Sequence, residues 1–161
     1  MKTKLVKSIM APLLGACALV TMVAPTAAGQ GTIGGTLQGT WDMRISLTDC
    51  AGHVIRSFPS LVEFTAGGTV VESNAGTPQA LKTPGEGVWS RTTDNTYAFR
   101  FKFFTFNTSN VFTGWTIIAG TTTVNSTGDT NAGSATVKVY NTSGFLLVSL
   151  CASTAGTRFK L

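Results

Sequence analysis

From residue 37 onward, short runs of alternating apolar and polar residues are separated by turn-forming residues. In the first run, Trp41, Met43 and Ile45 alternate with polar neighbours, which is the pattern of a β-strand with one buried face. Turns such as Ala66-Gly67-Gly68 supply the backbone geometry of tight hairpins. No stretch has the apolar spacing of a helix longer than about two turns. The sequence therefore predicts an all-β chain.

The alternation marks eight strands in sequence, joined mostly by short hairpins. We expect one loop over residues 49–59 and a second, rich in glycine and proline, over residues 75–85. The predicted strands are Trp41–Thr48, Ser60–Thr65, Thr69–Asn74, Gly87–Thr92, Tyr97–Phe103, Phe112–Val124, Ala132–Tyr140 and Phe145–Phe159.

An open sheet of this many strands would expose unpaired backbone along both of its outer strands. Closure into a barrel removes both edges and leaves an interior that side chains fill or that a small ligand shares. A two-sheet sandwich is the alternative, but it usually needs longer crossing connections than these turns provide. We therefore expect an eight-stranded antiparallel up-and-down barrel over residues 37–161.

The N-terminal residues have the composition of a secretion signal. A basic start (Lys2, Lys4 and Lys7) precedes an apolar stretch over residues 9–23, and small residues favour cleavage after Ala28. The stretch is shorter than the roughly 20 residues that span a bilayer, so we expect no transmembrane span in the mature chain. We predict a signal peptide over residues 1–28, a flexible segment over 29–36, and a secreted or periplasmic protein. Leu14-Gly15-Ala16-Cys17 also resembles a bacterial lipobox, so a lipid anchor at Cys17 is the alternative.

Removal of the signal changes the charge of the protein. Three of the 12 basic residues leave with it and all 7 acidic residues stay, so the net charge falls from +5 to +2. No cluster of Lys and Arg with interleaved aromatic residues remains, so we expect no nucleic-acid partner.

Two cysteines remain outside the predicted signal. Cys50 follows the first predicted strand and Cys151 lies within the last, and these strands are neighbours in a closed barrel. An even number of cysteines is typical of disulfide pairing in an exported chain. We therefore predict a Cys50–Cys151 disulfide.

The two ends of the predicted barrel carry a recognisable pairing of residues. Gly39-Thr40-Trp41 opens the first strand and Arg158 lies three residues from the C-terminus. This pairing resembles the signature of the calycins, the group that includes lipocalins and avidin-like barrels, although no helix is expected before the last strand. The resemblance implies that Trp41 packs across one end of the barrel with Arg158 over its indole face, a favourable cation–π contact.

Motifs of catalysis or metal binding are missing from the sequence. His53 is the only histidine, and no His-x-x-x-His, Cys-x-x-Cys or Gly-x-Ser-x-Gly pattern occurs. Alternation places Glu63 on an outer face, and we expect Glu72 and Glu86 to be solvated near strand ends. A carboxylate inside the barrel would instead be a candidate general acid. We expect no catalytic residue, no cofactor and no metal site.

Aromatic residues gather in one strand, where Tyr97, Phe99, Phe101 and Phe103 share a face. They either fill a solid core or, together with Trp89 and Trp115, line a cavity that suits an apolar or aromatic ligand. Phe104 and Phe106 fall on the opposite face and would suit a partner-binding or dimerising patch, and so a homo-oligomer. Asn107, Asn125 and Asn141 match the N-glycosylation pattern, but all three lie at predicted turns, where Asn is common.

These observations favour a lipocalin-like barrel that binds a small apolar or aromatic molecule in its interior. A barrel enzyme of the cyclase or isomerase type is one alternative, because such catalysis can rely on shape and a few polar groups. A solid barrel with a structural or envelope-associated role is another. A cavity would exclude the solid barrel, and a buried ionisable group facing that cavity would favour the enzyme.

Overall fold

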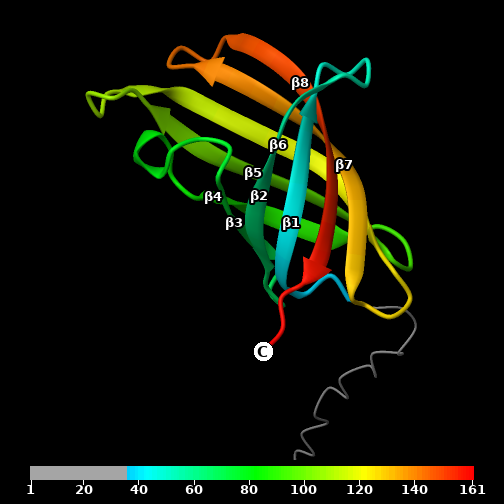
Figure 1. Cartoon of the computed structure of the whole chain (residues 1–161). Helices are drawn as coiled ribbons and strands as arrows, with labels where there is room; N and C mark the ends of the chain where they lie inside the picture. Colours follow the sequence, from blue (N-terminus) through cyan, green and yellow to red (C-terminus); the bar gives the residue numbers. More distant parts are fainter. Residues whose placement is uncertain (1–35) are drawn as a thin grey trace, which may run out of the picture. The chain divides into compact units, whose positions relative to one another are not determined.

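The computed structural model describes residues 36–161, which form a closed antiparallel barrel of eight consecutive strands (Figure 1). The predicted fold class is therefore confirmed. The predicted signal peptide, its alternative lipidation site Cys17 and residues 29–35 of the predicted flexible segment lie outside the described residues. The strands are β1 (Gly39–Thr48), β2 (Val54–Phe64), β3 (Thr69–Asn74), β4 (Gly85–Arg91), β5 (Thr96–Phe106), β6 (Phe112–Val124), β7 (Thr130–Asn141) and β8 (Leu146–Arg158), and a short 3-10 helix, η1 (Gln79–Leu81), precedes β4.

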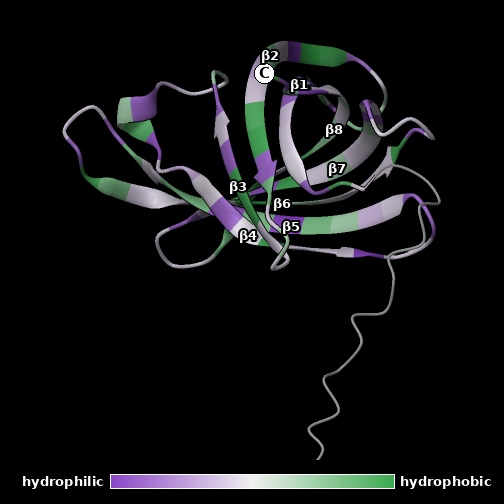
Figure 2. Ribbon diagram, turned by 90° about the horizontal axis from the view of Figure 1, so that it is seen from below, coloured by the Kyte–Doolittle hydropathy of each residue, from purple (hydrophilic) through white to green (hydrophobic). Residues whose placement is uncertain are grey.

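The barrel is closed by the pairing of the first strand with the last. β1 and β8 lie side by side in Figure 1, and their register runs from Trp41 opposite Arg158 to Thr48 opposite Cys151. Hydrophobic and hydrophilic residues alternate along the strands (Figure 2), because successive side chains of a strand point to opposite faces. The residues that face inward thus come from every strand.

Three turns share one side-chain device. The Oδ1 atom of Asn141 accepts hydrogen bonds from the backbone N–H groups of Ser143 and Phe145, at 3.0 and 2.9 Å. Asn107 accepts two such bonds in the β5–β6 turn and Asn125 two in the β6–β7 turn. The three asparagines therefore serve the turns in which they lie, as expected from their positions in the sequence.

The second strand is longer than the sequence predicted. β2 begins at Val54 rather than at Ser60, and the predicted loop over residues 49–59 shrinks accordingly. Residues 54–57 are two apolar residues followed by two polar ones, so they lack the alternation that marks a strand with one buried face. All four are exposed. Pro59 lies within the strand, where its carbonyl accepts a hydrogen bond from the Ala75 backbone N–H at 3.0 Å. Proline has no N–H to donate, and it is therefore usual only at special strand positions.

One end of the barrel is filled by tightly packed side chains and is the closed end. The largest fully buried residues gather there: Trp41, Tyr97, Leu37, Val70 and Val124. The indole N–H of Trp41 donates to the Leu37 carbonyl at 2.8 Å. This cluster supplies the hydrophobic stabilisation of the fold at the end where both chain termini of the barrel lie.

Arg158 seals the closed end. Its guanidinium carbon lies 4.3 Å from the centroid of the Trp41 ring, and its nitrogens donate to the carbonyls of Thr36, Gln38 and Gly128 at 2.6–2.7 Å. Gly39 has a φ of +122°, and a Cβ at this position would lie 2.7 Å from an Arg158 nitrogen. A glycine at residue 39 thus leaves room for the Arg158 guanidinium to lie over the Trp41 ring.

A disulfide joins Cys50, just after β1, to Cys151 of β8. The cysteines are 101 residues apart in the sequence, and their Cα atoms lie 4.9 Å apart. The predicted bridge is therefore confirmed, and it lies where the pairing of β1 with β8 ends. A structural disulfide is typical of an oxidising, extracytoplasmic compartment. Within the described part of the chain, no helix is long and apolar enough to cross a bilayer.

Candidate functional site: the barrel cavity

A cavity of about 230 Å³ occupies the barrel between the closed-end core and the opposite, open end. Because of this cavity, the barrel interior is not solid. Most of the cavity wall is apolar. The apolar lining comes from β1 and β2 (Met43, Ile45, Leu47, Phe58, Val62 and Phe64), from β5 and β6 (Phe99, Phe101, Phe103 and Ile118), and from β7 and β8 (Ala135, Val137, Val139, Leu150 and Ala152).

The predicted aromatic stripe divides along its length. Phe99, Phe101 and Phe103 line the cavity, and the rings of Phe99 and Phe101 are stacked, with centroids 6.1 Å apart. Tyr97 lies one step nearer the closed end and is part of the buried core. Trp89 packs edge-on against Tyr97, and its indole N–H donates to the Thr65 carbonyl at 3.0 Å. The stripe is thus core at one end and cavity wall at the other.

The structure places Trp115 on the outer face, not beside the cavity as expected. Trp115 lies opposite Phe104, whereas its neighbour Thr116 lies opposite Phe103 and lines the cavity. The rings of Phe112 and Tyr140 stack on Trp115, and the Lys102 ammonium lies 4.5 Å from its centroid. Phe104 is exposed, as the sequence predicted for the outer face of this strand.

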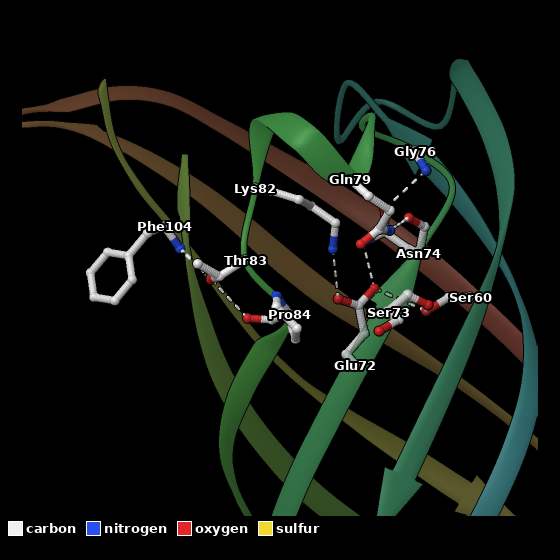
Figure 3. A network of polar contacts seen from close by, with 10 residues as sticks. All are labelled: Ser60, Glu72, Ser73, Asn74, Gly76, Gln79, Lys82, Thr83, Pro84 and Phe104. Atoms are coloured by element: carbon white, nitrogen blue, oxygen red, sulfur yellow. Dashed lines mark hydrogen bonds and ion pairs between the residues drawn. The ribbon is translucent and has the colours of Figure 1, made fainter. Parts of the chain in front are cut away.

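A buried ion pair lies at the open end of the cavity (Figure 3). The ammonium of Lys82 lies 3.3 Å from Glu72 Oε2, and the Lys82 side chain is completely buried. Glu72 is only 4% exposed. Its Oε1 atom accepts hydrogen bonds from Ser60 Oγ, at 2.9 Å, and from Asn74 Nδ2. The expectation that Glu72 is solvated is therefore wrong.

Local strand geometry explains how this pair comes together. Glu72 has the same parity along β3 as the buried Val70, so its side chain points inward although it lies near the strand end. Lys82 arrives from the segment after η1, which is held along β5 by the Thr83 N–H donating to the Phe104 carbonyl at 3.0 Å. The Lys82 ammonium also lies 4.8 Å from the Phe103 ring. The parity of Glu72 was visible in the sequence, but the approach of Lys82 was not.

Further polar groups lie at the floor of the cavity. Thr122 Oγ1 donates to Asn131 Oδ1 at 3.2 Å, and Asn131 Nδ2 approaches the Met43 sulfur at 3.5 Å. Thr154 Oγ1 is buried and has no hydrogen-bond partner among residues 36–161. At the open end, Arg56 also lines the cavity, and its guanidinium lies 5.3 Å from the Phe58 ring. The cavity therefore has an apolar belt between a polar floor and a polar rim.

The remaining candidate residues lie outside the cavity. His53 is exposed, and its Nδ1 atom lies 2.8 Å from Asp49 Oδ2. The hydrogen bond with His53, together with one from the Ala51 backbone N–H, holds the pKa of Asp49 below its usual value. Glu63 and Glu86 are exposed. In the described range, no group of three or more His, Cys, Asp or Glu side chains is placed to hold a metal ion.

The geometry suits a small molecule with a largely apolar body. Phe99, Phe101 and Phe103 offer ring surface, whereas hydrogen-bonding groups gather at the two ends of the cavity. Such a combination of an apolar wall with a few placed polar groups is the usual make-up of small-molecule sites. A comparison with known protein families and with curated proteins finds no match to this chain.

Proposed function

We propose that this protein is an extracytoplasmic carrier or receptor that binds a small, largely apolar molecule in the interior of its barrel. The observation that carries the proposal is the cavity of about 230 Å³ with its aromatic wall. Displacing water from such a wall favours binding of apolar groups. The disulfide supports a location outside the cytoplasm.

A place among the calycins is part of the same proposal. It is supported by the closed antiparallel barrel and by the contact of Arg158 with Trp41 at the closed end. The lipocalin-like interpretation places the ligand entrance at the other end, where Arg56 and Asn74 border the cavity. A shared fold carries many functions, so the proposal depends on the cavity and not on the fold.

The polar groups restrict the chemistry of the ligand. The charges of Glu72 and Lys82 compensate each other at 3.3 Å, which leaves Arg56 as the uncompensated charge among the cavity-lining residues. A ligand with an apolar body and one polar or anionic group at the open end satisfies this arrangement. A polycation does not, because it would meet Arg56 with a like charge.

The test compares two phenylalanines on the two faces of β5. Phe101→Ala enlarges the cavity, whereas Phe104→Ala makes the same chemical change on the outer face and is the control. N-phenyl-1-naphthylamine, a neutral apolar dye, is titrated into the wild type and both variants, and urea unfolding is followed on the same samples. We expect the wild type to bind the dye, Phe101→Ala to change its affinity by about tenfold, and Phe104→Ala to leave the affinity unchanged.

A solid barrel gives the opposite result. Phe101→Ala in a fully packed core would cost roughly 3–5 kcal/mol, and the wild type would bind no dye. Beside an existing cavity the same truncation costs less, because Phe101 makes fewer contacts there. Severe destabilisation together with absence of dye binding would therefore refute the proposal.

A second candidate function is proton-transfer catalysis on the bound molecule, and it is favoured by Glu72. This carboxyl group lines an apolar cavity, where it is placed to exchange a proton with a bound molecule. Native mass spectrometry of the protein purified from its own host would identify a bound ligand. If the protein is an enzyme, incubation with the wild type alters that ligand, and Glu72→Gln binds it without altering it.

A further inference from the structure

One half of the last strand has no neighbour on its outer side. β8 pairs with β1 only from Cys151 to Arg158, because β1 ends at Thr48 and the chain turns away at the disulfide. Residues 146–150 still pair with β7 on the other side. Within the described part of the chain, no backbone hydrogen bond or strand pairing covers the outer edge of residues 146–150. We call these five residues the free edge.

The free edge is apolar and exposed. The exposed fractions are 50% for Leu146, 60% for Leu147 and 44% for Val148, and Phe145 just before them is 70% exposed. Consecutive strand residues point to opposite faces, so both faces of the hairpin tip carry exposed apolar side chains. The free edge contains no charged residue and no proline, two of the features that usually protect an exposed strand edge, although its pairing with β7 is irregular between Leu146 and Val148.

The turn itself does not require these apolar residues. The β6–β7 turn at the closed end uses the same asparagine device, and there Asp129 and Thr130 follow it. In the β7–β8 turn, Phe145 and Leu146 occupy the comparable place after Asn141. A turn held by an asparagine therefore forms with polar residues at these positions as well as with apolar ones, such as Val111 and Phe112 in the β5–β6 turn.

We propose that the free edge pairs with the free edge of a second copy of this chain, joining the two barrels into a continuous sheet. Antiparallel pairing about a two-fold axis is self-complementary. An axis at Val148 places Leu146 opposite Leu150 of the partner subunit and the two Val148 side chains opposite each other. No like charges meet in this arrangement, and apolar cross-strand pairs stabilise it.

The backbone selects a strand over a lipid bilayer as the occupant. The free edge presents N–H and C=O groups that need hydrogen-bond partners once they leave water. A second strand supplies these partners, whereas the hydrocarbon of a bilayer does not. The proposal is independent of what the cavity binds.

The experiment places charges on the proposed two-fold axis. Val148→Lys and Val148→Glu are prepared separately, and association is measured by analytical ultracentrifugation over a range of protein concentrations. Each variant alone sets like charges opposite each other, so we expect its dimer dissociation constant to rise by at least about tenfold over the wild type. An equimolar mixture of the two variants sets opposite charges on the axis and should restore the dimer.

Val71→Lys is the matched control. Val71 is an outward-facing valine of similar exposure, 40% against 44% for Val148. It lies on β3, which is paired on both sides, opposite Glu63 and Glu86. We expect this variant to dimerise and to bind the dye as the wild type does.

The proposal is overturned if the wild type remains a monomer at every concentration. It is also overturned if the mixture of Val148→Lys with Val148→Glu does not recover the dimer. A monomeric wild type that sediments with phosphatidylcholine vesicles, and loses this binding in Val148→Lys, would assign the hairpin tip to a membrane surface instead.

Discussion

The buried pair of Glu72 and Lys82 allows a quantitative test of the site. Lys82→Met removes the ammonium but keeps an unbranched side chain, whose sulfur can pack against Phe103. Glu72→Gln removes the charge but keeps an acceptor for Ser60. Each single change leaves the other group buried without its counter-charge. We expect each to lower the free energy of unfolding by about 3–5 kcal/mol.

The double variant separates the pair from its surroundings. Because neither charge remains, Glu72→Gln with Lys82→Met should cost less than the sum of the two single changes, with a coupling energy of about 2–3 kcal/mol. Urea unfolding of the oxidised protein, analysed by linear extrapolation, gives the four free energies of the cycle. In a thermal scan, a 3 kcal/mol loss would lower Tm by roughly 10–15 °C.

The reasoning depends on the exclusion of water from the pair. Solvent-exposed ion pairs contribute about 0–1 kcal/mol. If both single variants lose less than about 1 kcal/mol and the costs add, Glu72 and Lys82 are solvated, and the polar rim described above does not exist in solution.

Three further predictions concern other parts of the barrel. Arg158→Ala removes the contact with Trp41 and the hydrogen bonds at the closed end; calorimetry should show a loss of about 2–4 kcal/mol, with dye affinity unchanged. A large loss of dye binding without a loss of stability would show that the ligand binds at the closed end, beside Arg158, and not at the open end. Cys151→Ser should cost about 3–5 kcal/mol, and peptide mapping without reduction should find Cys50 linked to Cys151 in exported wild type; free thiols there would contradict the bridge. The Asp49 carboxyl should titrate below 3.8 by NMR, and His53→Ala should raise its pKa. Since folding lowers the pKa of Asp49, the small contribution of this group to stability is present above pH about 4 and is lost as the pH falls through the folded-state pKa. If the pKa of Asp49 is unchanged in His53→Ala, the hydrogen bond with His53 is not the cause of the lowered pKa.

The alternating residues and the turns were sufficient to predict the barrel. Strand alternation is a local property, and a glycine or asparagine at a turn acts within a few residues. Closure then brings the chain ends together, so the Cys50–Cys151 bridge followed from the order of the strands. The start of β2 at Val54 could not be predicted, because residues 54–57 have no buried face and apolar and polar residues therefore do not alternate there.

The cavity and its polar groups needed the tertiary structure. Both faces of β6 carry large or apolar side chains, with Trp115 and Ile117 on one and Ile118 on the other, so alternation alone did not reveal which face is inside. That face is set by the register with β5. Lys82 lies in a connecting segment, and only its contact with β5 directs the side chain toward Glu72. The free edge of β8 likewise arises where β1 turns away, because strand pairing depends on residues far apart in the chain, whereas alternation depends on neighbours.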